Sequence, residues 1–190
     1  MEQKVEGRER VECFVKAHRG KSVMIFTDGS VNEEYSGVGS CAAIIIPLES
    51  WETETKQSEV FSVLADSTEA EVCGIALALD MAIQYFSTRH KLDYRESLFV
   101  LSDCKAAIDI VINRGHTGGY VRVLSRIRSH LRSLRGMMVD VTLVWIPGHC
   151  DIYYNDVVDH CAKTATLNPD NIPSTMVTTD ACKKTYCKAM

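Results

Sequence analysis

The stretch Met24-Ile25-Phe26-Thr27-Asp28-Gly29-Ser30 decides the fold class, because it joins a strongly apolar run to a carboxylate and a glycine. The β-branched, aromatic and apolar residues over 23–27 predict a strand. A carboxylate is costly to remove from water beside such a segment. We therefore interpret Asp28 as a residue that serves chemistry, in preference to an aspartate that only forms a turn before glycine.

Three further carboxylates end or open other predicted elements. Glu71 lies in Ser67-Thr68-Glu69-Ala70-Glu71, Asp103 follows the apolar run Leu98–Ser102, and Asp159 lies in Asn155-Asp156-Val157-Val158-Asp159. Carboxylates that a scaffold brings together repel one another unless a hard divalent cation lies between them. The sequence therefore predicts metal-dependent phosphodiester chemistry.

The remaining pattern predicts an α/β fold with a mixed sheet. Strands are expected over 23–27, 40–47, 53–64, 98–102 and 141–146, and helices over 68–86, 104–113, 120–134 and 155–167. Ser67 or Thr68 is the expected N-cap of the long helix. The first three strands form an antiparallel meander, with the third at an exposed edge, and crossover helices join them to the parallel strands. Asp28, Glu71 and Asp103 can meet where strand ends converge.

Composition indicates a globular protein without a membrane segment. The chain has 190 residues, of which 46% are hydrophobic and 24% charged, as in an ordinary soluble domain. No apolar run approaches the roughly 20 residues that span a bilayer, and the polar start has no signal-peptide apolar region. We expect the cytosol or nucleus. The net charge of −4 argues against indiscriminate coating of nucleic acid.

The eight cysteines are scattered without a Cys-x-x-Cys pair, which favours reduced thiols over disulfides or zinc. Cys182 and Cys187 are the only loosely zinc-like pair, and two ligands do not make a site.

Five motifs in order resemble those of the ribonuclease H domain family. They are Thr27-Asp28-Gly29-Ser30, Ala70-Glu71-Val72, Leu101-Ser102-Asp103, Trp145-Ile146-Pro147-Gly148-His149, and Asn155-Asp156-Val157-Val158-Asp159. The match covers about residues 23–165. It implies a ribonuclease H-like fold with a mixed five-stranded sheet, three antiparallel then parallel strands, flanked by helices. It also implies an endonuclease that hydrolyses the RNA strand of RNA–DNA hybrids and leaves 5′-phosphate and 3′-hydroxyl ends.

The resemblance also implies roles for individual residues. Asp28, Glu71, Asp103 and Asp159 would hold two Mg²⁺ ions, with Mn²⁺ as an alternative, about 4 Å apart. His149 would assist proton transfer and product release. Candidates for contact with the RNA 2′-hydroxyls are Gly29, Ser30, Ser67, Thr68 and Asn155.

Some assignments have a competitor nearby. Residues two apart on a helix face different directions, so only one of Glu69 and Glu71 can point at the metals, and the motif favours Glu71. In the same way the motif favours Asp159 over Asp156, while Asp103 has the alternative role of N-cap for the next helix.

A second set of alternatives concerns the helix over 120–134. Its arginines, at 122, 126, 128, 132 and 135, form either a stripe that grips the DNA-strand phosphates or an ordinary solvated face.

The chain looks most like the ribonuclease H domain that follows the reverse transcriptase of non-LTR retrotransposons. On that resemblance a reverse transcriptase domain of the same polyprotein is a candidate partner besides the hybrid. We expect a linker or helical lead-in over 1–21, the domain over 22–167 and a tail over 168–190.

The loop after His149 carries Asp151 and Tyr154 where relatives usually have glycines for left-handed turns. This departure keeps one alternative open, a catalytically weak domain that binds nucleic acid or acts as a scaffold.

Overall fold

The structure is a computed structural model that describes residues 2–32, 37–62, 65–89, 95–112 and 119–167. Within these residues the strands form one five-stranded sheet in the order β3-β2-β1-β4-β5. The strands are β1 (Val23–Asn32), β2 (Val38–Ile46), β3 (Thr55–Ser62), β4 (Glu96–Ser102) and β5 (Val139–Trp145). β1 pairs antiparallel with β2 and β2 with β3, whereas β1–β4 and β4–β5 are parallel. The predicted mixed sheet, with β3 at an edge, is confirmed.

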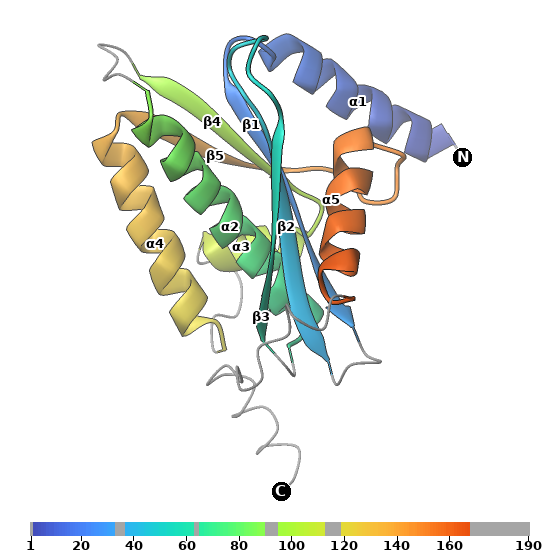
Figure 1. The fold of residues 1–190 in the computed structure, drawn as a ribbon. Coiled ribbons are helices and arrows are strands. Elements are labelled where there is room, and N and C mark those ends of the chain that lie inside the picture. The colour runs from blue at the N-terminus through green and yellow to red at the C-terminus, as the bar shows by residue number, and fades with distance from the viewer. Residues whose placement is uncertain (1, 33–36, 63–64, 90–94, 113–118, 168–190) are drawn as a thin grey trace, which may run out of the picture.

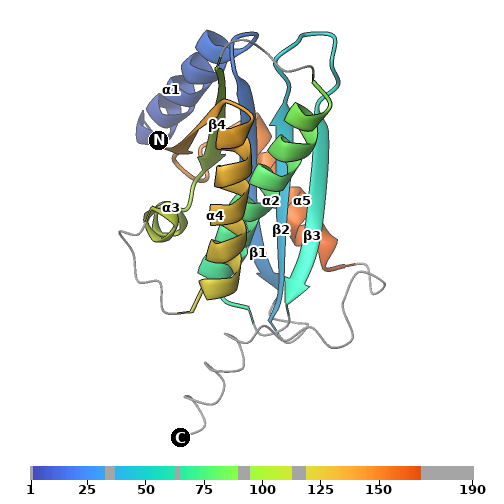
Figure 2. The same ribbon diagram turned by 90° about the vertical axis from the view of Figure 1, so that its left-hand side faces the viewer.

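Helices cover both faces of the sheet (Figure 1). They are α1 (Glu2–His18), α2 (Ser67–Ser87), α3 (Lys105–Val111), α4 (Val121–Gly136) and α5 (Tyr153–Ala165). One apolar cluster joins the sheet to α2, α3 and α4, with Ile25, Leu79 and Ile127 at its centre. A second cluster joins the other face to α1 and α5 through Val11, Phe26 and Val158. Figure 2 shows α4 beside α2 on the first of these faces. The protein thus has three layers, helix–sheet–helix.

The long helix α2 is the core helix of the first face. It has the length and mean hydropathy of a membrane span, although it contains no uninterrupted apolar run. In the structure 61% of its most apolar window is buried, and Ile75, Leu79 and Ala82 pack in the core. We therefore interpret α2 as the buried helix of a globular domain.

Two sequence predictions about local structure are wrong. The N-cap of α2 is Asp66, whose carboxylate accepts a hydrogen bond from the Glu69 amide at 2.7 Å, and not Ser67 or Thr68. Asp28 does not end its strand, because β1 continues to Asn32 by pairing with β2 as far as Val38. Only the parallel pairing with β4 stops early, at Phe26 opposite Leu101. Asp28 therefore lies where β1 is still paired with β2 but no longer with β4.

The six described cysteines, at 13, 41, 73, 104, 150 and 161, are free thiols, as the sequence predicts for them. Cys182, Cys187 and the whole tail over 168–190 lie outside the described residues.

Candidate active site

Three of the predicted carboxylates meet at the open end of the β1–β4 pair. One carboxylate oxygen from each of Asp28, Glu71 and Asp103 lies within 4.8 Å of the others. Asp28 is 6% exposed, and Glu71 and Asp103 are half-buried. We call these three residues the acidic cluster.

Two glycines allow α2 to approach β1 closely enough to form this cluster. A Cβ atom added at Gly29 would overlap the backbone of Ala70 and Glu71. A Cβ atom added at Gly74 would overlap the Thr27 hydroxyl and lie 3.0 Å from the Asp28 carbonyl. The contact at Gly29 is made by the backbone of α2, and Gly74 meets the Asp28 carbonyl as well as the Thr27 side chain, so the distance from Asp28 to Glu71 follows from how closely the helix packs on the strand.

Asp103 is held from several sides. The parallel register pairs Phe26 with Leu101, so two residues further on Asp28 lies level with Asp103. The Trp145 indole Nε1 donates to the Asp103 carbonyl at 3.0 Å, and the Asn155 amide donates to Asp103 Oδ2 at 3.1 Å. A Cβ atom on Gly148 would lie 2.8 Å from the same Oδ2. The first contact fixes the backbone of Asp103, and the other two orient its carboxyl group.

Crowding changes the protonation of the cluster. Burial, and then the charges of Asp103 and Asp159, raise the pKa of Asp28 to about 7. Burial, and then the charges of Asp28 and Asp103, raise the pKa of Glu71 to about 10. Glu71 therefore keeps its proton at neutral pH and shares a hydrogen bond with Asp28, so the two titrate as a pair.

The donor set fits a hard divalent cation. All three cluster residues offer carboxylate oxygens, the ligands that Mg²⁺ and Mn²⁺ prefer. Within the part of the chain that the structure describes, Glu71 Oε2 is buried without a hydrogen-bond partner. A cation would satisfy this oxygen and offset the repulsion that raises both pKa values.

The fourth predicted carboxylate lies beside the cluster and not within it. Asp159 on α5 is near enough for its charge to act on Asp28, but its Oδ2 pairs with the Lys163 ammonium at 2.7 Å. The spacing of four residues on a helix is the signal in the sequence from which this pair could have been found. Its competitor Asp156 is exposed in the first turn of α5.

The loop between β5 and α5 carries His149 on an exposed, left-handed backbone. The φ angles of His149 and Asp151 are 54° and 55°. Asp151 thus adopts the conformation that glycine would favour, and aspartate tolerates it. Tyr154 avoids the expected difficulty, because it belongs to α5. Its ring packs 5.3 Å from that of Phe26, and its hydroxyl donates to Glu54 at 2.6 Å.

The five candidates for substrate contact have different surroundings. Ser67 is exposed and Thr68 half-buried at the start of α2, and Ser30 is half-buried on β1 beside Gly29. Asn155 is 5% exposed and is turned toward Asp103, a contact that sequence reasoning missed. Its Oδ1 is buried without a protein partner among the described residues.

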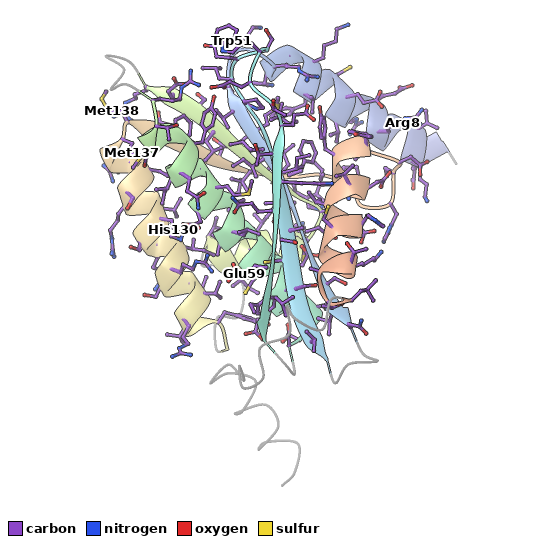
Figure 3. All side chains as sticks on the ribbon, in the orientation of Figure 1. Arg8, Trp51, Glu59, His130, Met137 and Met138 are labelled. Atoms are coloured by element: carbon purple, nitrogen blue, oxygen red, sulfur yellow. The ribbon has the colours of Figure 1, made fainter. Side chains whose placement is uncertain are left out.

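The arginines of α4 are all exposed, and Arg126 is engaged by acidic neighbours. Arg126 pairs with Glu59 on β3 at 3.5 Å and with Asp80 on α2 at 4.0 Å. His130 lies on the side of α4 that faces α2, 4.0 Å from Asp80 (Figure 3). Arg126 therefore links α4 to β3 and α2, and a stripe of arginines that grips DNA phosphates stays a prediction.

The raised pKa values predict how stability depends on pH without divalent cations. A carboxyl whose folded pKa is raised stabilises the fold fully below its unfolded pKa, and this contribution is lost as pH rises through the folded value. For Asp28 that window runs from 3.8 to about 7, and for Glu71 from 4.5 to about 10. We expect the free energy of unfolding in EDTA to fall by about 2 kcal/mol or more between about pH 5 and pH 8.

Urea unfolding at several pH values checks this expectation, with Asp28→Asn as the comparison. The variant lacks the titrating group, so its stability should depend less steeply on pH, and Mg²⁺ should flatten the slope of the unmodified protein. Equal slopes for both proteins in EDTA would show that the cluster is not the cause.

Comparisons with known proteins agree with this arrangement. The family model of RNase H matches residues 20–166. The N-terminal ribonuclease H domain of Rv2228c from Mycobacterium tuberculosis has a TM-score of 0.56 at 16% identity, over 77% of this chain and 96% of that one. The RNase H1 of Halobacterium salinarum has a TM-score of 0.55 at 16% identity, over 76% and 97%. At these identities the likeness shows the fold alone.

Two further structures were solved with nucleic acid. LC11-RNase H1, in complex with an RNA/DNA hybrid, has a TM-score of 0.55 at 13% identity and covers 76% of this chain and 99% of its own. The foamy viral protease–reverse transcriptase, also in complex with a hybrid, has a TM-score of 0.55 at 12% identity over 77% of this chain and 20% of its own. Comparison with curated protein sequences gave no match.

Proposed function

The chain belongs to the ribonuclease H family, and from this premise we propose that it hydrolyses the RNA strand of RNA–DNA hybrids at the acidic cluster. The observation that carries the proposal is the approach of Asp28, Glu71 and Asp103 to within 4.8 Å on a fold of this family. The family match alone does not require active carboxylates, whereas their convergence supports a working site.

The acidic cluster and Asp159 would hold the metal. The chemistry that bound Mg²⁺, or Mn²⁺ in its place, supplies is activation of a water and neutralisation of charge on the scissile phosphate, with two ions as the resemblance implies. Glu71 must give up its proton to become a ligand. Lys163 partly neutralises Asp159 in the structure, so Asp159 is the carboxylate whose partner has to change.

The other residues orient the site and handle protons and substrate. Asn155 and Trp145 fix Asp103 through the two hydrogen bonds described above. His149, which is exposed on its loop, would exchange a proton with substrate or product. Recognition of the RNA strand would use its 2′-hydroxyls, with Gly29, Ser30, Ser67, Thr68 and Asn155 as contacts.

We also propose that the domain serves reverse transcription in a retroelement. The motif pattern and tail resemble the domain that follows non-LTR reverse transcriptases, and the likeness to the foamy viral protease–reverse transcriptase is consistent with this. A reverse transcriptase frame in the coding sequence upstream would support it, and an unrelated upstream gene would count against it.

Cleavage of labelled duplexes tests the hydrolase proposal. With Mg²⁺ the protein should cut an RNA–DNA hybrid and leave double-stranded RNA and double-stranded DNA intact, and EDTA should stop the cutting. The products should carry 5′-phosphate and 3′-hydroxyl ends. Binding of the hybrid without cleavage would instead indicate a catalytically weak binding domain, and cleavage of DNA duplexes would point to a different branch of the fold.

A further inference from the structure

The N-terminal helix α1 contacts the loop that carries His149. A Cβ atom added at Gly7 would lie 2.9 Å from Pro147 Cγ and 3.4 Å from Cys150 Sγ. Val11, one turn further along, is buried in the same apolar cluster as Ile146, Cys150 and Ile152. α1 therefore touches the loop on both sides of His149.

A second contact ties the end of α1 to the start of α5. Arg19, just after α1, pairs with Glu54 at 3.3 Å, and the same Glu54 oxygen accepts the Tyr154 hydroxyl at 2.6 Å. Tyr154 belongs to the first turn of α5, where the loop ends. The loop thus contacts α1 directly at Pro147 and Cys150, and just after the loop Tyr154 is connected to Arg19 through Glu54.

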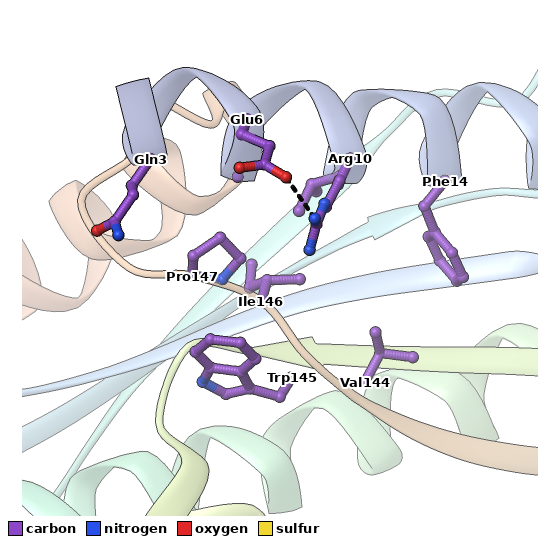
Figure 4. Close-up of a pocket in the computed structure, with 10 residues that line it drawn as sticks. Gln3, Glu6, Arg10, Phe14, Val144, Trp145, Ile146 and Pro147 are labelled. Atoms are coloured by element: carbon purple, nitrogen blue, oxygen red, sulfur yellow. Dashed lines mark hydrogen bonds and ion pairs between the residues drawn. The ribbon is translucent and has the colours of Figure 1, made fainter. Parts of the chain in front are cut away.

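Between the loop contact and the rest of α1 the packing is incomplete. A cavity of about 400 Å³ separates Glu6 and Arg10 on α1 from Trp145 and Pro147 (Figure 4). Further along, Phe14 packs edge-on against Phe99 of β4 with ring centroids 5.1 Å apart. Beside this cavity α1 reaches the loop through Gly7 and Val11, and Gly7 marks the closest approach.

The direction of the His149 side chain depends on this contact. The His149 side chain is exposed and its backbone is in the left-handed region, so packing of the side chain does not fix the position of the residue. Its direction is set by the backbone between Ile146 and Cys150, which are both buried against α1. A shift of about 1 Å in this segment would misplace the His149 side chain, and a misplacement of that size is enough to lower the catalytic rate.

We propose that α1 is a positioning element of the active site, which holds the 147–152 loop so that His149 faces the acidic cluster. This role rests on the proposed function and goes beyond it, because the family match begins at residue 20 and leaves α1 out. Among the described residues α1 makes no hydrogen bond or ion pair with the cluster carboxylates, so its main effect is expected on the histidine step, and any smaller effect on the metal site would pass through Gly148, which lies beside Asp103 Oδ2.

The test is Gly7→Leu, with Glu9→Leu as the matched control. Leucine at position 7 must push Pro147 away, whereas Glu9 is exposed two residues further on and faces another direction. For Gly7→Leu we expect kcat on the hybrid to fall about tenfold, with KM and calorimetric Mg²⁺ affinity unchanged within about twofold. Glu9→Leu should leave all three unchanged. Gly7→Ala should also lower kcat, although alanine favours the helix more than glycine does.

A double mutant distinguishes positioning from general damage. In a His149→Ala background, Gly7→Leu should have no further effect on kcat, because the group that α1 positions has gone. The same tenfold loss in that background, or an equal loss from Glu9→Leu, would overturn the proposal.

Hydrogen exchange separates this proposal from the hydrolase proposal. Amides of residues 148–152 should exchange faster in Gly7→Leu than in Glu9→Leu, while those of β1 stay protected. If the protein cleaves no hybrid, the hydrolase proposal fails, and exchange still decides whether α1 holds the loop. Unchanged exchange over 148–152 would overturn the role of α1 whatever the activity.

Discussion

Replacement of Asp103 by asparagine is expected to lower the rate of hybrid cleavage by at least about a thousandfold, equivalent to about 4 kcal/mol of transition-state stabilisation. Asparagine keeps the shape of the side chain but removes one of the three carboxyl groups that meet within 4.8 Å. A site with two carboxylates binds a divalent cation more weakly and neutralises phosphate charge less well. Single-turnover cleavage with saturating protein measures the chemical step.

The matched control is Asp140→Asn. Asp140 lies near the start of β5, opposite Ser97, whereas Asp103 follows the other end of the paired strand β4. It is exposed and pairs with Arg95 at 2.8 Å, so its loss should change neither rate nor fold. Wild-type cleavage by Asp103→Asn, with Mg²⁺ dependence retained, would rule out the acidic cluster as the catalytic site.

Replacement of Gly29 by alanine is expected to destabilise the fold by about 3 kcal/mol or more. The added methyl group overlaps the backbone of Ala70 and Glu71, which no change of rotamer can relieve. Either α2 or β1 must move, and both carry cluster residues. Activity of the remaining folded protein should therefore fall about a hundredfold. Urea unfolding and cleavage assays below the unfolding transition measure the two effects.

Gly136→Ala is the control for Gly29→Ala. Gly136 ends α4, and a Cβ atom there meets nothing within 4 Å. Alanine at a helical position without strain should leave stability unchanged or raise it slightly. If Gly29→Ala were as stable as Gly136→Ala, the close approach of β1 and α2 would not be what forms the cluster.

The order of strands and helices from residue 22 onward could be predicted because each element has a strong local pattern. The apolar runs of β1 and β4 and the helical spacing of Val72, Ile75 and Leu79 are visible in the sequence. Their ends could not be predicted as well. β1 extends past Asp28 because its antiparallel partner β2 continues to Val38, and the length of this pairing depends on the register between the two strands and not on the pattern of β1 alone.

The choice between Glu69 and Glu71 shows where local reasoning stops. Spacing establishes that the two face different directions, but only the resemblance favoured Glu71. In the structure Glu71 joins the cluster, while the amide of Glu69 is capped by Asp66. The rotation of α2 that decides this follows from the contact at Gly29 and Gly74, between segments far apart in the chain.

The partners of Asp103 and Tyr154 could not have been predicted from local pattern. Trp145 and Asn155 reach Asp103 from 42 and 52 residues away in sequence. Tyr154 was expected to strain a turn, yet it forms part of a helix and bonds with Glu54, 100 residues earlier. Such contacts depend on the assembled tertiary fold.

The apolar surface of α2 has a consequence for the growing chain. α2 packs against α3, α4 and β4 as well as the first strands, and those elements are translated later. When residue 87 has just left the ribosome, α2 has the mean hydropathy of a membrane span, and the elements α3, α4 and β4 that pack on it in the folded protein have not yet emerged. Chaperones that bind apolar segments of nascent chains should bind the polypeptide at this stage and dissociate once residues up to 136 have emerged.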